Sequence, residues 1–384
     1  MTARSGCLMT LLAAALACVW GCAPSAEAPG SSGAALAGAD GGMPCPWSPG
    51  TQKRLQAFFS VGPKGKQPDY TLEDELVKLI RAAKPGSSIR GSMFMYERKR
   101  ISTELATAAK RPVDVKMVLD GKNSGNSPTK TLQKGIGAAN VTLCKSGCIG
   151  TGINHNKFFL FSKLCDGSKD VVVQSSANLK AVPKHNDLVV VRGDAKLYAA
   201  YLKYWKAERA QKKNLNYGAG PNGVTWGSST PTQVRFYPRK SGDAIVEILN
   251  NVKCTKRGKR IYVAMSMWNT GRVAIVKRLK ALRSKGCDVK IVVGTYSINR
   301  KLVAYLKKTF PRKRWRQHTK LHSKYMVINA KYNGKNQWMV VTGSANYCTG
   351  TIRNNDNATM VVRSKSMAAK YFSNWMKIWK EANP

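Results

Sequence analysis

Two of the four histidines in this 384-residue chain, His155 and His322, begin similar blocks of sequence. In each block a lysine follows two residues later, and a Ser-x-Asn segment follows 21 or 22 residues later. The two sets are His155, Lys157, Ser176 and Asn178, and His322, Lys324, Ser344 and Asn346. An imidazole can attack an electrophile or carry a proton, an ammonium neutralises charge, and hydroxyl and carboxamide groups donate hydrogen bonds. Cleavage of a phosphodiester needs these groups together.

These residues stand at the ends of segments that have the pattern of buried strands. In "HNKFFLF" the alternation of a strand places His155 and Lys157 on one face, and "HSKYMVI" does the same for His322 and Lys324. The apolar runs "VVVQSSANL" and "WMVVTGSANY" end in small polar residues, with Ser and Asn again on a shared face. We therefore expect each block to present four reactive groups at the end of a sheet.

The two blocks belong to a longer internal repeat with an offset of 167 to 169 residues. Ahead of each block lie a helix-like run, a β-like run ("SIRGSMFMY" or "RIYVAMSMW"), a second helix-like run and a buried strand. An amphipathic, aromatic helix follows each block. Alternating strands and helices predict an α/β fold. We expect two halves, residues 45–215 and 234–384, joined by the Gly-rich linker 216–233.

The paired segments resemble the duplicated HKD motif of the phospholipase D superfamily, and the resemblance covers most of the chain beyond residue 44. It implies two pseudo-twofold-related α/β/α units, each with a mixed β-sheet flanked by helices, that meet at one active site. It also implies a phosphohistidine intermediate, with His155 as nucleophile and His322 as general acid, and neither a metal nor a cofactor. The phosphoryl oxygens would be bound by Lys157, Lys324, Asn178 and Asn346, with Ser176 and Ser344 in support.

Two acidic residues, Asp187 and Asp356, occupy matching places downstream of the Ser-x-Asn segments. In the family an acidic residue here fixes the second ring nitrogen of a catalytic histidine, so the resemblance implies this role for both. The alternative is that they cap turns beside a strand. The sequence also departs from the motif, since Ser162 and Asn329 stand where the family has Asp five residues after the lysine. This departure indicates a divergent branch.

Charge leaves the class of phosphodiester open. The chain has 64 Lys and Arg against 20 Asp and Glu, a net charge of +44, which indicates a polyanionic partner. The basic and aromatic segment 311–324 suits an anionic membrane or a single strand of nucleic acid. Two motifs in one chain favour a monomeric phospholipase D acting on phospholipid. The charge favours the alternative, a metal-independent nuclease for DNA or RNA. A non-catalytic polyanion binder is the third hypothesis.

The first 22 residues have the pattern of an export signal. Arg4 precedes the apolar run from Cys7 to Trp20, which is short for a membrane span. Cys22 ends a segment that resembles a lipobox, so a membrane-attached lipoprotein and a freely secreted protein are equal alternatives. Residues 23–44, rich in Ala, Gly, Ser and Pro, are expected to form a flexible tether.

Export makes disulfides possible, and seven cysteines follow residue 22. We expect one bridge within the set Cys144, Cys148 and Cys165, a second between Cys254 and Cys287, and at least one unpaired thiol. A zinc site is disfavoured because the chain has no Cys-x-x-Cys pair. The two remaining histidines, His185 and His318, are expected in solvated loops. Four aromatic residues near strand ends either line a pocket or belong to the core: Phe94, Tyr96, Trp268 and Tyr296.

Overall fold

The computed structural model describes residues 44–60, 68–220, 223–254 and 258–383. All of them belong to one compact unit, Ala37–Pro384. The expected export signal, and the expected tether up to residue 43, lie outside these residues. Within the described ranges no helix is both long enough and apolar enough to cross a membrane.

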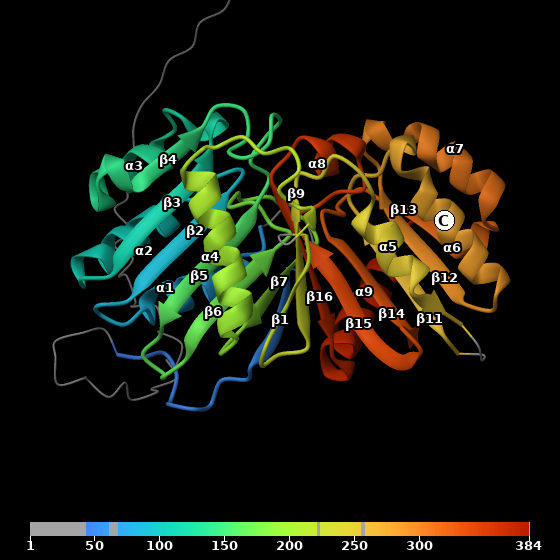
Figure 1. The fold of residues 1–384 in the computed structure, drawn as a ribbon, viewed down its shortest axis with the longest axis horizontal. Coiled ribbons are helices and arrows are strands. Elements are labelled where there is room, and N and C mark those ends of the chain that lie inside the picture. Colours follow the sequence, from blue (N-terminus) through green and yellow to red (C-terminus); the bar gives the residue numbers. More distant parts are fainter. Residues whose placement is uncertain (1–43, 61–67, 221–222, 255–257, 384) are drawn as a thin grey trace, which may run out of the picture. The chain divides into compact units, whose positions relative to one another are not determined.

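The first half of the described chain is a mixed sheet with helices packed on it (Figure 1). The strand order is β1-β7-β6-β5-β2-β3-β4, in which β2, β3 and β4 are parallel and the other neighbours are antiparallel. The strands are β1 (Leu55–Ser60), β2 (Ser88–Met93), β3 (Asp114–Asp120), β4 (Val141–Cys144), β5 (Lys157–Lys163), β6 (Lys169–Ser175) and β7 (Asn186–Val191). The helices are α1 (Thr71–Arg81), α2 (Lys99–Lys110), α3 (Ser127–Ile136) and α4 (Ala195–Arg209).

The second half repeats this order as β9-β16-β15-β14-β11-β12-β13, with β8 beside β9 and β10 paired to β14. The strands are β8 (Thr225–Trp226), β9 (Thr232–Tyr237), β10 (Val252–Lys253), β11 (Arg260–Met265), β12 (Asp288–Gly294), β13 (Trp315–His318), β14 (Lys324–Tyr332), β15 (Lys335–Gly343) and β16 (Asn357–Arg363). The helices are α5 (Ala244–Asn250), α6 (Val273–Ser284), α7 (Arg300–Thr309), α8 (Thr349–Arg353) and α9 (Lys365–Glu381). The predicted duplicated α/β fold is confirmed.

The segment 216–233, expected to be only a linker, is partly regular. It contains β8 and the first residues of β9, and the two strands pair as a hairpin with Thr225 opposite Val234. The glycines around β8 concealed this pairing in the sequence. The second sheet therefore begins inside the predicted linker.

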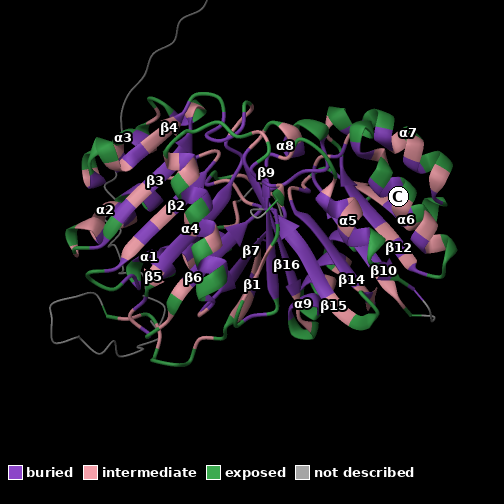
Figure 2. Cartoon of the chain, viewed as in Figure 1, coloured by how far each residue is buried: buried purple, intermediate pink, exposed green. Residues whose placement is uncertain are grey.

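The two halves share a hydrophobic core, and most strand residues are buried (Figure 2). The aromatic helix α4 contacts β6 of its own half and β9 of the other, whereas α9 contacts β15 and also β1. Tyr204 on α4 stacks on Phe236 of β9 with ring centroids 4.2 Å apart. Because each aromatic helix packs on both halves, loops from the two repeats can be held against each other.

Three disulfides occur within the described residues. Cys254–Cys287 confirms one prediction, and Cys144–Cys148 confirms that the first-half set holds a bridge. The third, Cys45–Cys165, was not predicted. Of the cysteines in the described ranges, Cys348 is a buried free thiol.

Candidate active site

Side chains from both repeats line one cavity of about 280 Å³. His155 and His322 lie just before β5 and β14, and the predicted lysines are the first residues of those strands. Asn178 and Asn346 follow the ends of β6 and β15. Both histidines and both of these asparagines line the cavity. Beside it, Lys157 Nζ donates to His155 O over 2.8 Å, and Lys324 Nζ donates to His322 O over 2.5 Å.

The ring of His155 is held by Asn357, the first residue of β16 in the second half. His155 Nδ1 lies 3.0 Å from Asn357 Oδ1. The amide orientation is fixed by two further bonds, because Asn357 Nδ2 donates to Thr351 O and Ser344 Oγ donates to Asn357 Oδ1. A carboxamide oxygen only accepts hydrogen bonds. The proton of neutral His155 therefore lies on Nδ1, and the lone pair lies on Nε2.

The ring of His322 is held in the same way by the first half. Its Nδ1 lies 2.7 Å from Oδ1 of Asn186, the first residue of β7. Asn186 Nδ2 donates to Lys184 O, and Ser176 Oγ is 3.4 Å from Asn186 Oδ1. Each of the two imidazoles is thus oriented by a carboxamide from the opposite repeat.

The predicted role of Asp187 and Asp356 as partners of the imidazoles is wrong. The carboxylate of Asp356 accepts from the backbone N–H groups of residues 148, 149 and 150. The carboxylate of Asp187 accepts from the hydroxyls of Thr342 and Tyr371. Both are fully buried structural groups.

A difference in turn length explains this error. The backbone N–H of Ser176 donates to Asp187 O, and that of Ser344 donates to Ala358 O, so Asp187 is equivalent to Ala358. From the serine to the orienting asparagine there are 10 residues in the first repeat and 13 in the second. The sequence signal that identifies the orienting residues is an asparagine at the first position of each of these strands.

The two serines also differ from expectation. Ser176 and Ser344 are completely buried, and their hydroxyls contact Asn186 and Asn357 and accept from backbone N–H groups of the following strand. They position the orienting asparagines and do not face a phosphate. Ser162, at the place of the motif Asp, has its own structural contact, since its Oγ accepts from Ser88 N.

The lysines and histidines of the site all have lowered pKa values. Burial lowers the pKa of Lys157 well below its usual value, with a smaller contribution from Lys324. Burial also lowers the pKa of Lys324 to about 7. The pKa values of His155 and His322 are lowered well below 6.5. Burial is the largest cause, and the charge of the nearby lysines is the next. An anionic group in the cavity would relieve these penalties.

The rim of the cavity combines aromatic and basic side chains. Phe94 lies with its ring centroid 5.0 Å from that of His155. From the other half, Tyr296 accepts a hydrogen bond from Lys184 Nζ and so bridges the two repeats at the rim. The other two aromatic candidates, Tyr96 and Trp268, are core residues.

Two groups in the described residues have ligand atoms close enough for a metal ion. They are Cys148, Glu208 and Asp356, and His185, His318 and Glu381. Cys148 is in a disulfide and offers no thiolate. The second group shows that the expectation of solvated loops for His185 and His318 is wrong, because both are buried where the two repeats meet.

A family model described as "Cardiolipin synthase, PLD-like domain" matches the chain twice, over residues 76–207 and 246–379. A search of curated proteins finds no match. Among solved structures, phosphatidylserine synthase of Haemophilus influenzae Rd KW20 is similar with a TM-score of 0.61 and 12% identity. The alignment covers 86% of this chain and 87% of that one.

Polyphosphate kinase from Porphyromonas gingivalis is also similar, with a TM-score of 0.55 and 10% identity over 84% of this chain and 50% of that one. At such identities these likenesses show a shared fold. The two matched segments correspond to the two repeats of the structure. The chain belongs to the family of the PLD-like domain of cardiolipin synthase, and its fold is that of the phospholipase D superfamily of phosphodiesterases.

Proposed function

We propose that this protein is a phospholipase D that hydrolyses phospholipid headgroup esters through a phosphohistidine. The observation that carries the proposal is the pair of imidazoles on one cavity, each with its Nδ1 on a carboxamide oxygen. This geometry leaves both Nε2 atoms for chemistry at one phosphorus atom. The adjacent lysines supply the positive charge that a phosphodiester needs.

In the proposed reaction Nε2 of His155 attacks phosphorus and forms a P–N bond. The P–O bond to the headgroup breaks as His322 Nε2–H gives its proton to the leaving alcohol oxygen. A water molecule then loses a proton to His322 and attacks phosphorus, which breaks the P–N bond and frees His155. The negative substrate favours the imidazolium that the first step requires, because it offsets the positive charge of Lys157 and Lys324.

Asn178 and Asn346 are proposed to bind the non-bridging oxygens. Both side chains line the cavity together with the two imidazoles. A carboxamide whose N–H groups contact a phosphoryl oxygen would stabilise the charge that develops in the transition state. Lys157 and Lys324 are proposed to share this role.

Several features favour phospholipid as the substrate. Four apolar side chains line the rim of the cavity: Phe94, Met95, Val182 and Met267. The net charge of +44 suits docking on an anionic membrane surface. The three disulfides favour an oxidising compartment and support the proposal of an exported, secreted or Cys22-lipidated protein. The same charge favours the second candidate, a nuclease.

A paired turnover assay in EDTA would test the proposal. One arm measures headgroup release from mixed phosphatidylcholine and phosphatidylglycerol vesicles, and the other measures cleavage of plasmid and single-stranded DNA. We expect headgroup release that is lost in His155→Ala and retained in Lys163→Ala, an exposed control at the far end of β5. DNA cleavage with intact vesicles would establish the nuclease instead. Silence in both arms would contradict both proposals.

A further inference from the structure

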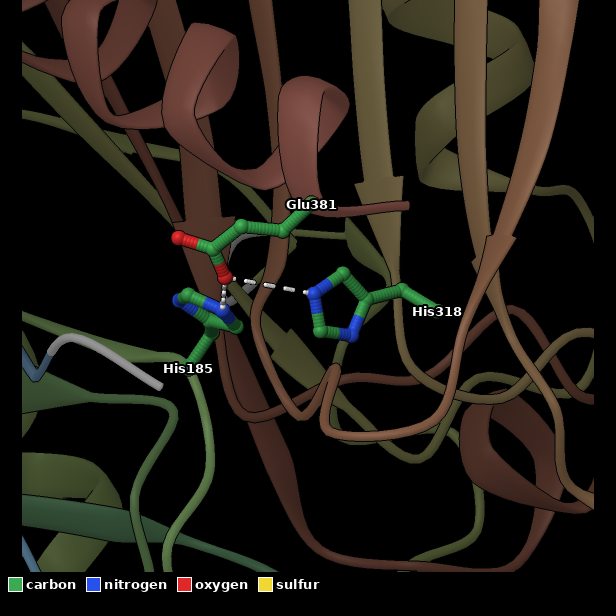
Figure 3. Close-up of side chains that lie close together, drawn as sticks. All are labelled: His185, His318 and Glu381. Carbon is green, nitrogen blue, oxygen red and sulfur yellow. Dashed lines mark hydrogen bonds and ion pairs between the residues drawn. The ribbon is translucent and has the colours of Figure 1, made fainter. Parts of the chain in front are cut away.

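Behind the catalytic loops, two buried histidines converge on one carboxylate (Figure 3). His185 Nε2 lies 2.8 Å and His318 Nε2 lies 3.5 Å from the same oxygen, Oε2 of Glu381. The two rings pack edge to face with centroids 4.9 Å apart. Glu381 is the last residue of α9, and its side chain is about half exposed, 49%.

The hydrogen bonding of His318 shows which atom carries its proton. The backbone N–H of Lys320 donates to His318 Nδ1 over 3.0 Å, so this nitrogen holds a lone pair and not a proton. In the neutral ring the proton is therefore on Nε2, which lies 3.5 Å from Glu381 Oε2 without the geometry of a hydrogen bond. A metal ligand at this position would need the opposite tautomer. The group is consequently a carboxylate that is within hydrogen-bond distance of His185 Nε2 and faces the N–H of His318.

The backbone around these histidines holds His322. The N–H of His185 donates to Lys320 O, and the N–H of His322 donates to His185 O, so the two segments pair as a short parallel bridge. The next residue, Asn186, holds the ring of His322. A shift of His185 would therefore move both the backbone contact and the ring contact of His322.

The opposite repeat has an equivalent arrangement with different chemistry. The N–H of His155 donates to Asp356 O, which makes Asp356 the counterpart of His185. Asp356 binds the loop ahead of His155 with its own carboxylate. His185 has an imidazole instead, and the carboxylate comes from Glu381, which also reaches His318 at the end of β13, ahead of His322.

We propose that Glu381 is a positioning residue for His322, because its carboxylate contacts the rings of both His185 and His318 and so links the two segments that hold His322. The inference rests on the proposed function in which His322 acts as general acid and base. Glu381 contacts no reacting atom, so its loss should slow only the steps in which His322 transfers a proton. Nucleophilic attack by His155 on a good leaving group does not need it.

Burst kinetics would separate these steps. With bis(p-nitrophenyl) phosphate the first leaving group departs without an acid, so wild type should release a burst of nitrophenol as the phosphohistidine forms. We expect Glu381→Ala to keep the burst rate and to lower the steady-state rate and phosphatidylcholine hydrolysis by about tenfold or more. His322→Ala should give the same pattern. Equal loss of burst and steady state in Glu381→Ala, or no loss, would overturn the proposal.

Matched variants complete the design. Glu381→Gln keeps an accepting oxygen and should restore most of the lost steady-state rate, whereas Lys380→Ala, an exposed neighbour on α9, should be unchanged. His318→Phe keeps the packed ring without its hydrogen bonds and should reproduce the selective loss, which serves as the test if Glu381→Ala does not fold. A normal steady-state rate in a folded His318→Phe would contradict the inference.

Two measurements do not depend on turnover. In ¹⁵N-imidazole spectra, His322 should be an Nδ1–H tautomer in wild type and a mixture of tautomers in Glu381→Ala; an unchanged tautomer would overturn the proposal. Failure of the proposed function would instead appear as a missing burst in wild type. Calorimetric titration with ZnCl₂ should show no stoichiometric binding to this group. Binding by wild type that is lost in Glu381→Ala would establish a metal site instead.

Discussion

Asn186 and Asn357 orient the two imidazoles with neutral carboxamide oxygens. A carboxylate at either position would place a negative charge beside the ring. A carboxylate stabilises an imidazolium, whereas a carboxamide only fixes the tautomer. Burial and the adjacent lysines lower the pKa of His155, and the carboxamide of Asn357 adds no negative charge that would oppose them. In the proposed mechanism, the identity of the orienting residue therefore contributes to the pH at which His155 can attack.

We expect Asn357→Asp to raise the pKa of His155. The nucleophile acts when deprotonated, so the acid limb of kcat/KM should move to higher pH, by about one pH unit or more. The profile of kcat/KM against pH for a soluble phosphodiester would show the shift. Asn357→Ala should lower the rate and should not move this limb to higher pH, because it removes a hydrogen bond that raises the pKa of His155. Identical limbs in Asn357→Asp and wild type would contradict the explanation.

Anion binding should depend on pH through Lys324. Its pKa is lowered to about 7 in the free site, and a bound anion raises it. At a pH between the pKa of Lys324 in the free site and its pKa in the complex, Lys324 takes up a proton when the anion binds. The affinity for tungstate should therefore fall as pH rises above about 7. Calorimetric titration at several pH values would measure this. Lys324→Met should reduce the dependence to the part that comes from Lys157 and the two imidazoles, whereas Lys163→Ala should keep all of it.

At the scale of elements, a loop from the first half is fixed by the turn that precedes β16. Asp356 accepts three backbone N–H groups of residues 148–150, and a Cβ at Gly150 would clash with Asn354 O. The disulfide Cys144–Cys148 closes the same loop. His155 follows this loop directly, so its position depends on these contacts.

Asp356→Ala should leave buried N–H donors without partners and lower the free energy of unfolding by about 1–3 kcal/mol. Denaturant unfolding would measure the loss. Activity of the folded fraction should also fall, because the loop that leads to His155 loses the hydrogen bonds that the carboxylate accepts. Lys365→Ala, at the exposed start of α9, is the control. Stability equal to wild type would show that the loop is held by other contacts.

The sequence predicts the helices and strands well, and the contacts between segments that are distant in the chain less well. Strand patterns and the repeat offset lead to the duplicated sheets, because those signals are local. The imidazole partners are missed because a turn longer by three residues shifts Asn357 relative to Asn186. His185 and His318 look like loop residues in the sequence, and they are buried only because the two repeats meet there. Cys45–Cys165 joins distant segments that no local pattern relates.

At the scale of the whole molecule, the excess of 44 positive charges acts on any anionic surface. Such attraction is screened by salt. We expect the KM for anionic vesicles to rise steeply between low and physiological ionic strength, while kcat for a small soluble phosphodiester changes little. Assays of both substrates over a range of NaCl concentrations would test this. A KM for vesicles that is insensitive to salt would exclude electrostatic docking.

The crossed bonds from Asn186 to His322 and from Asn357 to His155 also bear on how the duplicated gene can diverge. A mutation of the orienting asparagine in one copy first disturbs the histidine of the other copy. Selection on either histidine therefore acts on both copies at once, and neither copy can accumulate mutations independently of the other. Positions that serve only their own sheet, such as Ser162 and Asn329, escape this mutual constraint.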